Sequence, residues 1–185
     1  VIAEKLGVSR VPVREALKRL LCEGLLETRE GKGILTRSYN EQDILDLYTY
    51  RETLDGLATR LFTTRAEAMQ LEYLEMVYTE MGELRKNYES HEWEHHDADF
   101  HRIIARGTRN ERLIRAVSTI YEECFYLNKI FLYRDLGENA QADPSHLADV
   151  LKEHRSILDG IASKDPEKAE AAARKSVKLA TSRLM

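Results

Sequence analysis

Residues 2–37 decide how the chain begins, and they read IAEKLGVSRVPVREALKRLLCEGLLETREGKGILTR. A short segment with helical apolar spacing, residues 2–6, leads into Gly7-Val8-Ser9, and a second amphipathic segment begins at Arg10. Two helices joined by a short turn with a glycine are typical of a helix-turn-helix. Short extended stretches on both sides of Gly31-Lys32-Gly33 predict a β-hairpin, or wing. The sequence therefore predicts a winged helix-turn-helix over residues 1–38.

The charge distribution supports DNA binding by this head. Arg10 and Arg14 open the second helix, at the end that meets base edges in the major groove of DNA. Residues 1–40 carry a net charge of +3, whereas residues 41–185 carry −7. A basic head on an acidic body fits a small DNA footprint. Because +3 is modest, useful affinity is expected to need two heads on one double-stranded operator.

Composition excludes a membrane protein and points to the cytoplasm. No run of about 18 apolar residues exists, so no membrane span is expected. The N-terminus shows no signal-peptide pattern. Cys22 and Cys124 lie far apart within apolar helical patterns, and we interpret them as free, half-buried thiols of a reducing compartment. These features favour a cytoplasmic protein.

Residues 39–185 predict an all-helical second domain. Asn40 is a good helix N-cap, with Asp43 three residues later. No alternating strand pattern follows residue 40, so the expected fold class is mainly α, with a bundle of about six helices. Gly107 and Gly160 are interpreted as C-cap glycines. The expected helices span about 41–65, 66–88, 91–106, 110–135, 144–162 and 166–183.

Four of these helices carry polar residues within their apolar stripes. They are Arg51 in the first, Asp97 and His101 in the third, Asn128 in the fourth and His154 in the fifth. A buried charge is costly unless it is paired. The coincidence on four helices therefore predicts a shared polar cavity inside the bundle.

Asp97, His101 and His154 are candidate metal ligands, because an Asp and a His four residues apart share one helical face. One oxygen and two nitrogens suit zinc, nickel or manganese. Taken singly, either histidine is more often a hydrogen-bonded core residue than a metal ligand. Arg51 could bind an anion or form a buried salt bridge to an acid on another helix. Asn128 alone fits an interhelical hydrogen bond.

The run LGVSRVPVREALKRLLCEGLLETREGKG, residues 6–33, resembles the winged helix-turn-helix of the GntR family of bacterial transcription regulators. Val11 stands where the family usually has Thr, so a thymine methyl contact could replace one hydroxyl contact. The family's first DNA-domain helix is absent before Val1. The resemblance implies DNA contacts by Ser9, Arg10, Val11, Arg14, Gly31 and Lys32.

The remainder resembles the FCD effector domain of the FadR subfamily. The matching motifs are R-x-x-L-[DE] (Arg51, Leu54, Asp55), D-x-x-F-H (Asp97, Phe100, His101), Asn110, EHR-x-I-L (Glu153, His154) and Asp165 with Ala169. Metal-binding members use the Asp, both histidines and a fourth histidine on the last helix. Ser176 occupies that fourth position here. Three ligands with water or an effector carboxylate could hold the metal, or the site could be metal-free.

The resemblance implies a homodimeric, ligand-responsive transcription regulator, more often a repressor, that reads a palindrome. A small carboxylate effector would enter the helical cavity, where Arg51, Asn128, Tyr121 and Ser176 are expected to contact it. Two alternatives stay open. The helical domain could bind an acyl or other non-metal ligand, or only dimerise. In the second alternative the protein is a metalloenzyme that activates water, although no general base is evident beside the cluster.

Overall fold

The computed structural model describes residues 2–85, 90–136 and 144–184. Most of these residues are in helices, and the strands among them form one two-stranded antiparallel sheet. The expected mainly α fold class is therefore confirmed. The helices are α1 (Ile2–Leu6), α2 (Arg10–Cys22), α3 (Glu41–Arg65), α4 (Ala68–Leu84), α5 (Ser90–Gly107), α6 (Glu111–Leu136), α7 (Pro144–Ala162) and α8 (Pro166–Leu184), and the strands are β1 (Leu26–Arg29) and β2 (Gly33–Thr36).

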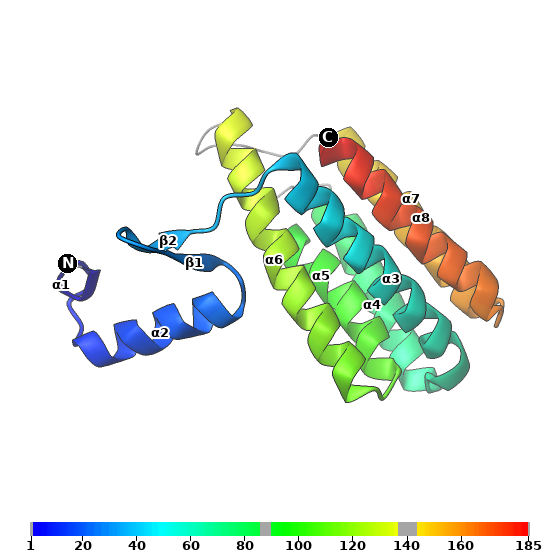
Figure 1. Ribbon diagram of the computed structural model, residues 1–185. Coiled ribbons are helices and arrows are strands. Elements are labelled where there is room, and N and C mark those ends of the chain that lie inside the picture. The colour runs from blue at the N-terminus through cyan, green and yellow to red at the C-terminus, as the bar shows by residue number, and fades with distance from the viewer. Residues whose placement is uncertain (1, 86–89, 137–143, 185) are drawn as a thin grey trace.

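The head consists of α1, α2 and the β1–β2 hairpin, and it lies beside the helical bundle (Figure 1). After α2 the chain turns at Gly24, which has φ 77°, and the amide of Leu25 donates 3.0 Å to the carbonyl of Leu20. This is the geometry of a Schellman C-cap. In the hairpin, Arg29 pairs with Gly33, and Gly31 at the tip has φ 73°, which favours glycine. Helix-turn-helix and wing both form as predicted.

The bundle begins where the sequence predicted it. The side chain of Asn40 accepts from the amide of Asp43, and that of Asp43 accepts from the amide of Asn40, both at 2.9 Å. This capping box fixes the start of α3. Figure 1 shows α3 packed in front of α4 and α5, with α7 and α8 paired on one side and α6 on the side that faces the hairpin. The six helices of residues 41–184 match the predicted ranges closely.

The hydrophobic core belongs to the bundle. Neither α1 nor α2 contains a buried residue, whereas each bundle helix contributes fully or nearly buried side chains. Burying one such large side chain contributes about 1.5–3 kcal/mol. The polar cluster described below is therefore set inside the most stable part of the molecule. The largest fully buried apolar side chains are Phe62, Phe100, Leu74, Met81, Ile104, Leu127, Leu147 and Ile157.

Two glycines serve packing, and their interpretation as C-caps is wrong. Gly107 ends α5, but the left-handed residue after this helix is Arg109, with φ 56°. A Cβ on Gly107 would lie 2.3 Å from the ring of Phe62. Gly160 lies inside α7, where a Cβ would lie 2.6 Å from Cα of Ala169. Both glycines allow close approach between helices.

The cysteines differ from the expected half-buried pair. Cys22 is exposed at the end of α2, whereas Cys124 is buried in α6. Both thiols are free. Burial raises the pKa of Cys124 to about 11, so its thiol stays protonated near neutral pH. Among the residues with described positions, no helix is long and apolar enough to cross a bilayer.

Candidate functional site

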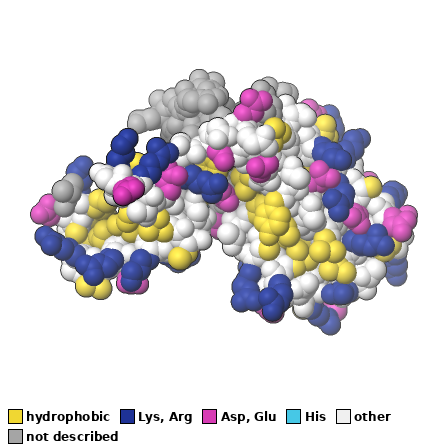
Figure 2. All heavy atoms as spheres, in the orientation of Figure 1, with side chains coloured by type: hydrophobic (Ala, Val, Ile, Leu, Met, Phe, Trp, Pro, Cys, Tyr) yellow, Lys and Arg dark blue, Asp and Glu magenta, His cyan; other side chains and the backbone are white. Residues whose placement is uncertain are grey.

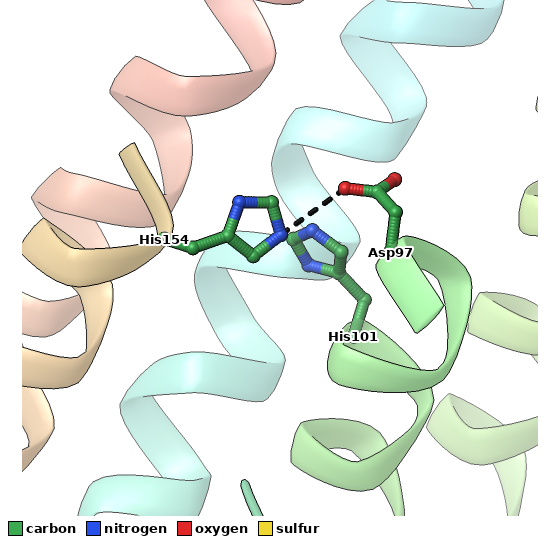
Figure 3. A group of neighbouring side chains, drawn as sticks. All are labelled: Asp97, His101 and His154. Carbon is green, nitrogen blue, oxygen red and sulfur yellow. Dashed lines mark ion pairs between the residues drawn. The ribbon is translucent and has the colours of Figure 1, made fainter. Parts of the chain in front are cut away.

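Two helices bring three candidate metal ligands together inside the bundle. Asp97 and His101 lie one turn apart on α5, and His154 on α7 faces them (Figure 3). One ligand atom from each of these residues can be chosen so that all three lie within 4.8 Å of one another. The two histidine side chains are 3% and 1% exposed, and that of Asp97 is 24% exposed. The predicted grouping of these three residues therefore exists in space.

The contacts of His154 fix which of its ring nitrogens carries a proton. Nδ1 lies 2.8 Å from the carbonyl oxygen of Val150, and because a carbonyl only accepts, Nδ1 must donate. In the neutral ring Nε2 is then a bare lone pair, 3.2 Å from Oδ1 of Asp97 and without hydrogen-bond geometry. A lone pair that faces a carboxylate oxygen needs a proton or a cation between the two atoms.

His101 also has a buried ring nitrogen without a partner. Its Nδ1 faces Oδ2 of Asp55 at 3.8 Å, and its ring stacks on Tyr121 with the centroids 4.9 Å apart. Its Nε2 has no hydrogen-bond partner. A carboxylate behind the far ring nitrogen is the usual way in which a histidine is oriented toward a metal.

The donor set of Asp97, His101 and His154 fits a divalent transition metal. Nitrogen and oxygen ligands at about 2.0–2.2 Å from an ion lie roughly 3–3.5 Å from one another. The observed limit of 4.8 Å requires a closure of roughly 1.3–1.8 Å, which side-chain rotation can supply. Two orphaned imidazole nitrogens inside a core are costly by themselves, so a bound cation would satisfy them.

Arg51 lies beside this cluster and is enclosed by its neighbours. Its Nη2 donates 2.8 Å to the hydroxyl of Tyr121, and its Nε lies 3.3 Å from Oδ2 of Asp55. The guanidinium also lies over the rings of Tyr121 and Tyr48, at 4.4 and 5.5 Å. Arg51 is thus in a buried salt bridge, as one alternative held, but its acidic partner is on the same helix and not on another one.

Burial sets the protonation of the cluster. It lowers the pKa of His101 well below its usual value, and the charge of His154 lowers it further. Burial alone would raise the pKa of Asp97, but contact with His154 brings it below the usual range. Near neutral pH, His101 is therefore neutral and Asp97 ionised, the states that bind cations. Burial raises the pKa of Asp55, against the opposing effect of Arg51.

Asn128 does not face the interior, so that prediction is wrong. The residue is exposed, whereas Tyr121, Cys124 and Leu127 are buried. The buried stripe of α6 continues from Cys124 by a step of three residues to Leu127, and the step of four would have reached Asn128. Tyr121 is where the prediction placed it, against Arg51 and the ring of His101.

Ser176 is buried, but its hydroxyl is directed to another partner. It donates 3.0 Å to Oε2 of Glu153, which also pairs with Arg183. These residues line a shallow groove of about 310 Å³ between α7 and α8. An effector contact by Ser176 stays a prediction.

Sequence reasoning gave no separate role to Asp55 or to the carbonyl of Val150. Asp55 follows Arg51 by four residues, a spacing at which an acid and a base on one helix usually meet. That spacing could have identified the salt bridge. The carbonyl of Val150, which fixes the tautomer of His154, belongs to the backbone one turn earlier and leaves no mark in residue type.

The candidate DNA-binding face is open to solvent. Figure 2 shows Lys and Arg side chains along the lower edge of the head, where α2 lies in Figure 1. Arg10 and Arg14 make no ion pair with any residue whose side chain is described, whereas Lys18 pairs with Glu15 on α2 and Arg19 with Glu23 at its C-cap. Ser9 makes no side-chain cap to α2. All six predicted contacts are exposed: Ser9, Arg10, Val11, Arg14, Gly31 and Lys32.

Comparisons with known proteins agree with both halves of the chain. The family of bacterial regulatory proteins called gntR matches residues 1–35, and the FCD domain matches residues 46–178. A probable D-xylose utilization operon transcriptional repressor of Paenarthrobacter nicotinovorans is 30% identical over 171 residues, 92% of this chain and 71% of that relative. The Nta operon transcriptional regulator of Aminobacter aminovorans is 35% identical over 124 residues, 65% of this chain and 57% of that relative.

A solved structure, McbR/YncC of E. coli, has the same fold, with a TM-score of 0.83 at 17% identity, over 99% of this chain and 83% of the other. The relatives are named as transcription regulators, and the metalloenzyme alternative is therefore wrong. The chain belongs to the GntR family of bacterial transcription regulators, with a gntR helix-turn-helix at its N-terminus and an FCD domain after it.

Proposed function

We propose that this regulator is a homodimeric repressor whose heads bind a palindromic operator and whose helical domains bind a small carboxylate metabolite. The heads comprise residues 1–38, and the effector domain comprises residues 39–185. Repression is supported by the name of the relative from P. nicotinovorans. The protein would act in the cytoplasm, where its operator lies.

Operator binding is assigned to the exposed, unpaired cations at the start of α2 and to the wing tip. Substitution of Arg14 by Ala should weaken binding to DNA from upstream of the protein's own gene by about 1–3 kcal/mol in a mobility-shift assay. Arg19→Ala is the matched control, because Arg19 already pairs with Glu23 at 2.7 Å. Equal affinity of Arg14→Ala and the unchanged protein would refute this docking.

The effector site is assigned to the polar cluster, and one observation carries it. The Nε2 atoms of His101 and His154 are buried without hydrogen-bond partners beside the ionised Asp97. These three residues would hold zinc, nickel or manganese. When bound, the ion supplies open coordination positions for an effector carboxylate. Arg51 and Tyr121 would donate hydrogen bonds to the same carboxylate.

Metal-independent regulation is the second candidate. Arg51 already bonds Asp55 and Tyr121, and a proton between Nε2 of His154 and Oδ1 of Asp97, which are 3.2 Å apart, would take the place of a cation. Ser176 stands at the position of the family's fourth ligand and bonds Glu153. In this alternative the helical domain binds an acyl or other non-metal ligand, or only dimerises.

Elemental analysis together with thermal shifts separates the two candidates. Stoichiometric metal in the purified protein, or a rise in Tm with Zn²⁺, Ni²⁺ or Mn²⁺, supports the metal-assisted site. The rise should disappear in His154→Ala and persist in His96→Ala, since His96 is on α5 but pairs with Glu80 away from the cluster. Shifts with lactate or gluconate alone, and none with metals, would support the metal-free site.

Regulation requires that the effector prefers one arrangement of the two heads, because a ligand with equal affinity for both shifts nothing. A coupling of about 1–3 kcal/mol between effector and operator is typical. Arg51→Ala should therefore abolish the release of operator DNA by the effector and leave binding in its absence intact. If release persists, Arg51 is structural.

A further inference from the structure

One carboxylate oxygen contacts donors from three helices. Oδ2 of Asp55, on α3, accepts a hydrogen bond from the hydroxyl of Tyr121 on α6 at 2.7 Å. The same atom lies 3.3 Å from Nε of Arg51 and 3.8 Å from Nδ1 of His101 on α5. The Asp55 side chain is only 2% exposed, so solvent does not relieve this competition.

Oδ2 of Asp55 does not form hydrogen bonds with all three of these donors. A carboxylate oxygen has two lone-pair directions. Tyr121 and Arg51 are within hydrogen-bond distance of Oδ2, whereas His101 at 3.8 Å is outside it. His101 is therefore near the carboxylate that could fix its tautomer but does not yet bond it.

We propose that Asp55 is a positioning residue that links the anion-binding and metal-binding parts of the site. An anion that takes over Arg51 and Tyr121 releases Oδ2, which then accepts from Nδ1 of His101. This bond leaves the lone pair on Nε2 and strengthens His101 as a ligand. Metal and carboxylate thus bind cooperatively, each raising the other's affinity by the same factor. The inference rests on the metal-assisted form of the proposed function.

Substitution of the carboxylate tests the positioning role. Asp55→Asn keeps the shape of the side chain but removes its charge, and Zn²⁺ should bind about 10- to 100-fold more weakly in competition with a chromophoric chelator. Glu52→Gln is the matched control. It lies three residues earlier on α3 and pairs with Arg174 and Lys178 away from the cluster, so the Kd for Zn²⁺ should not change.

A second variant changes the Zn²⁺ affinity in the opposite direction. Tyr121→Phe keeps the ring that stacks on His101 but removes the shortest hydrogen bond to Oδ2 of Asp55. His101 then has less competition for Oδ2, and Zn²⁺ should bind a few-fold more tightly. A purely structural role for these residues predicts weaker or unchanged binding for both. The tighter binding expected for Tyr121→Phe therefore tests the inference even if Asp55→Asn folds poorly.

Acetate is the anion with which the coupling between anion binding and Zn²⁺ binding is tested. Saturating acetate should tighten Zn²⁺ binding more in the unchanged protein than in Asp55→Asn, where only direct coordination of acetate to the ion couples the two. An equal acetate effect in both proteins, or unchanged Zn²⁺ affinity in Asp55→Asn, overturns the inference and leaves the proposed metal site standing. Failure of the unchanged protein to bind Zn²⁺ overturns both the inference and the metal-assisted function.

Discussion

The hydroxyl of Tyr39 donates a 3.0 Å hydrogen bond to Oε1 of Glu123 and so ties the segment between head and bundle to α6. Arg37 donates to the same oxygen at 2.9 Å, and its guanidinium lies over the ring of Tyr39. The Glu123 side chain is 15% exposed. Because Tyr121 is on the same helix, α6 contacts both the connecting segment and the polar cluster.

Loss of this contact should expose the connecting segment. Glu123→Ala removes both hydrogen bonds, and a bond to a charged group contributes about 1.5–3 kcal/mol. Trypsin should therefore cleave after Arg37 about tenfold faster, as measured by mass spectrometry. Glu122→Ala is the control, because Glu122 pairs with Arg102 on α5. Equal cleavage in both variants would show that Glu123 does not hold the segment.

Acid should destabilise the bundle through His101. Its pKa is lowered by folding, so below the unfolded value of about 6.5 the unfolded chain binds more protons. The stability that His101 contributes in its neutral form is fully present above that pH and is lost as the pH falls. The free energy of unfolding in urea should thus decrease between about pH 7 and pH 5.

The His101→Gln variant should flatten this pH profile, and His96→Gln should keep it. Asp97 also has a lowered pKa, so its contribution is lost only at more acidic pH, below its unfolded value of about 3.9. Asp55 has a raised pKa, so its effect on the pH dependence of the free energy of unfolding has the opposite sign. An unchanged slope in His101→Gln would mean that another group controls the profile.

Val11 should determine base preference without affecting stability. Its side chain is 70% exposed at the start of α2, so Val11→Thr should change the free energy of unfolding by less than about 0.5 kcal/mol. If Val11 contacts a thymine methyl, the variant should alter preference at one operator position by about 1–3 kcal/mol. Mobility shifts with each base at every position check this, and a uniform change would argue against a base contact.

Two glycines within helices should respond oppositely to Ala. In Gly160→Ala the new Cβ meets the backbone of Ala169, and overpacking costs about 1–3 kcal/mol. This exceeds the gain of about 1 kcal/mol in helix propensity. Gly82 in α4 has open space, so Gly82→Ala should be stabilising. Urea denaturation of both variants checks the difference, and stabilisation by both would mean that α7 and α8 separate easily.

Much of the fold was accessible from sequence because its signals are local. Helical apolar spacing predicted the bundle helices, and Asn40 with Asp43 marked the start of α3. The grouping of Asp97, His101 and His154 followed from one rule, that buried polar residues converge. The structure brings these three together as that rule requires.

The errors concern contacts that depend on packing. Asn128 was misplaced because a buried helical stripe can advance by three or four residues, and neighbouring helices decide which. The partner of Arg51 was sought on another helix, although Asp55 is one turn away. Gly107 and Gly160 looked like caps because their sequence position does not reveal the side chains or backbone that approach them.

Gly160 also bears on the site from a distance. It lies six residues after His154 on α7, about 9 Å along the helix axis. Its close approach to Ala169 packs α7 tightly against α8, and this packing would restrict movement of the helix that carries His154. Any adjustment to ions of different radius must then come from Asp97 and His101 on α5. Ion-size tolerance would thus depend partly on a residue that has no side chain and touches no ligand.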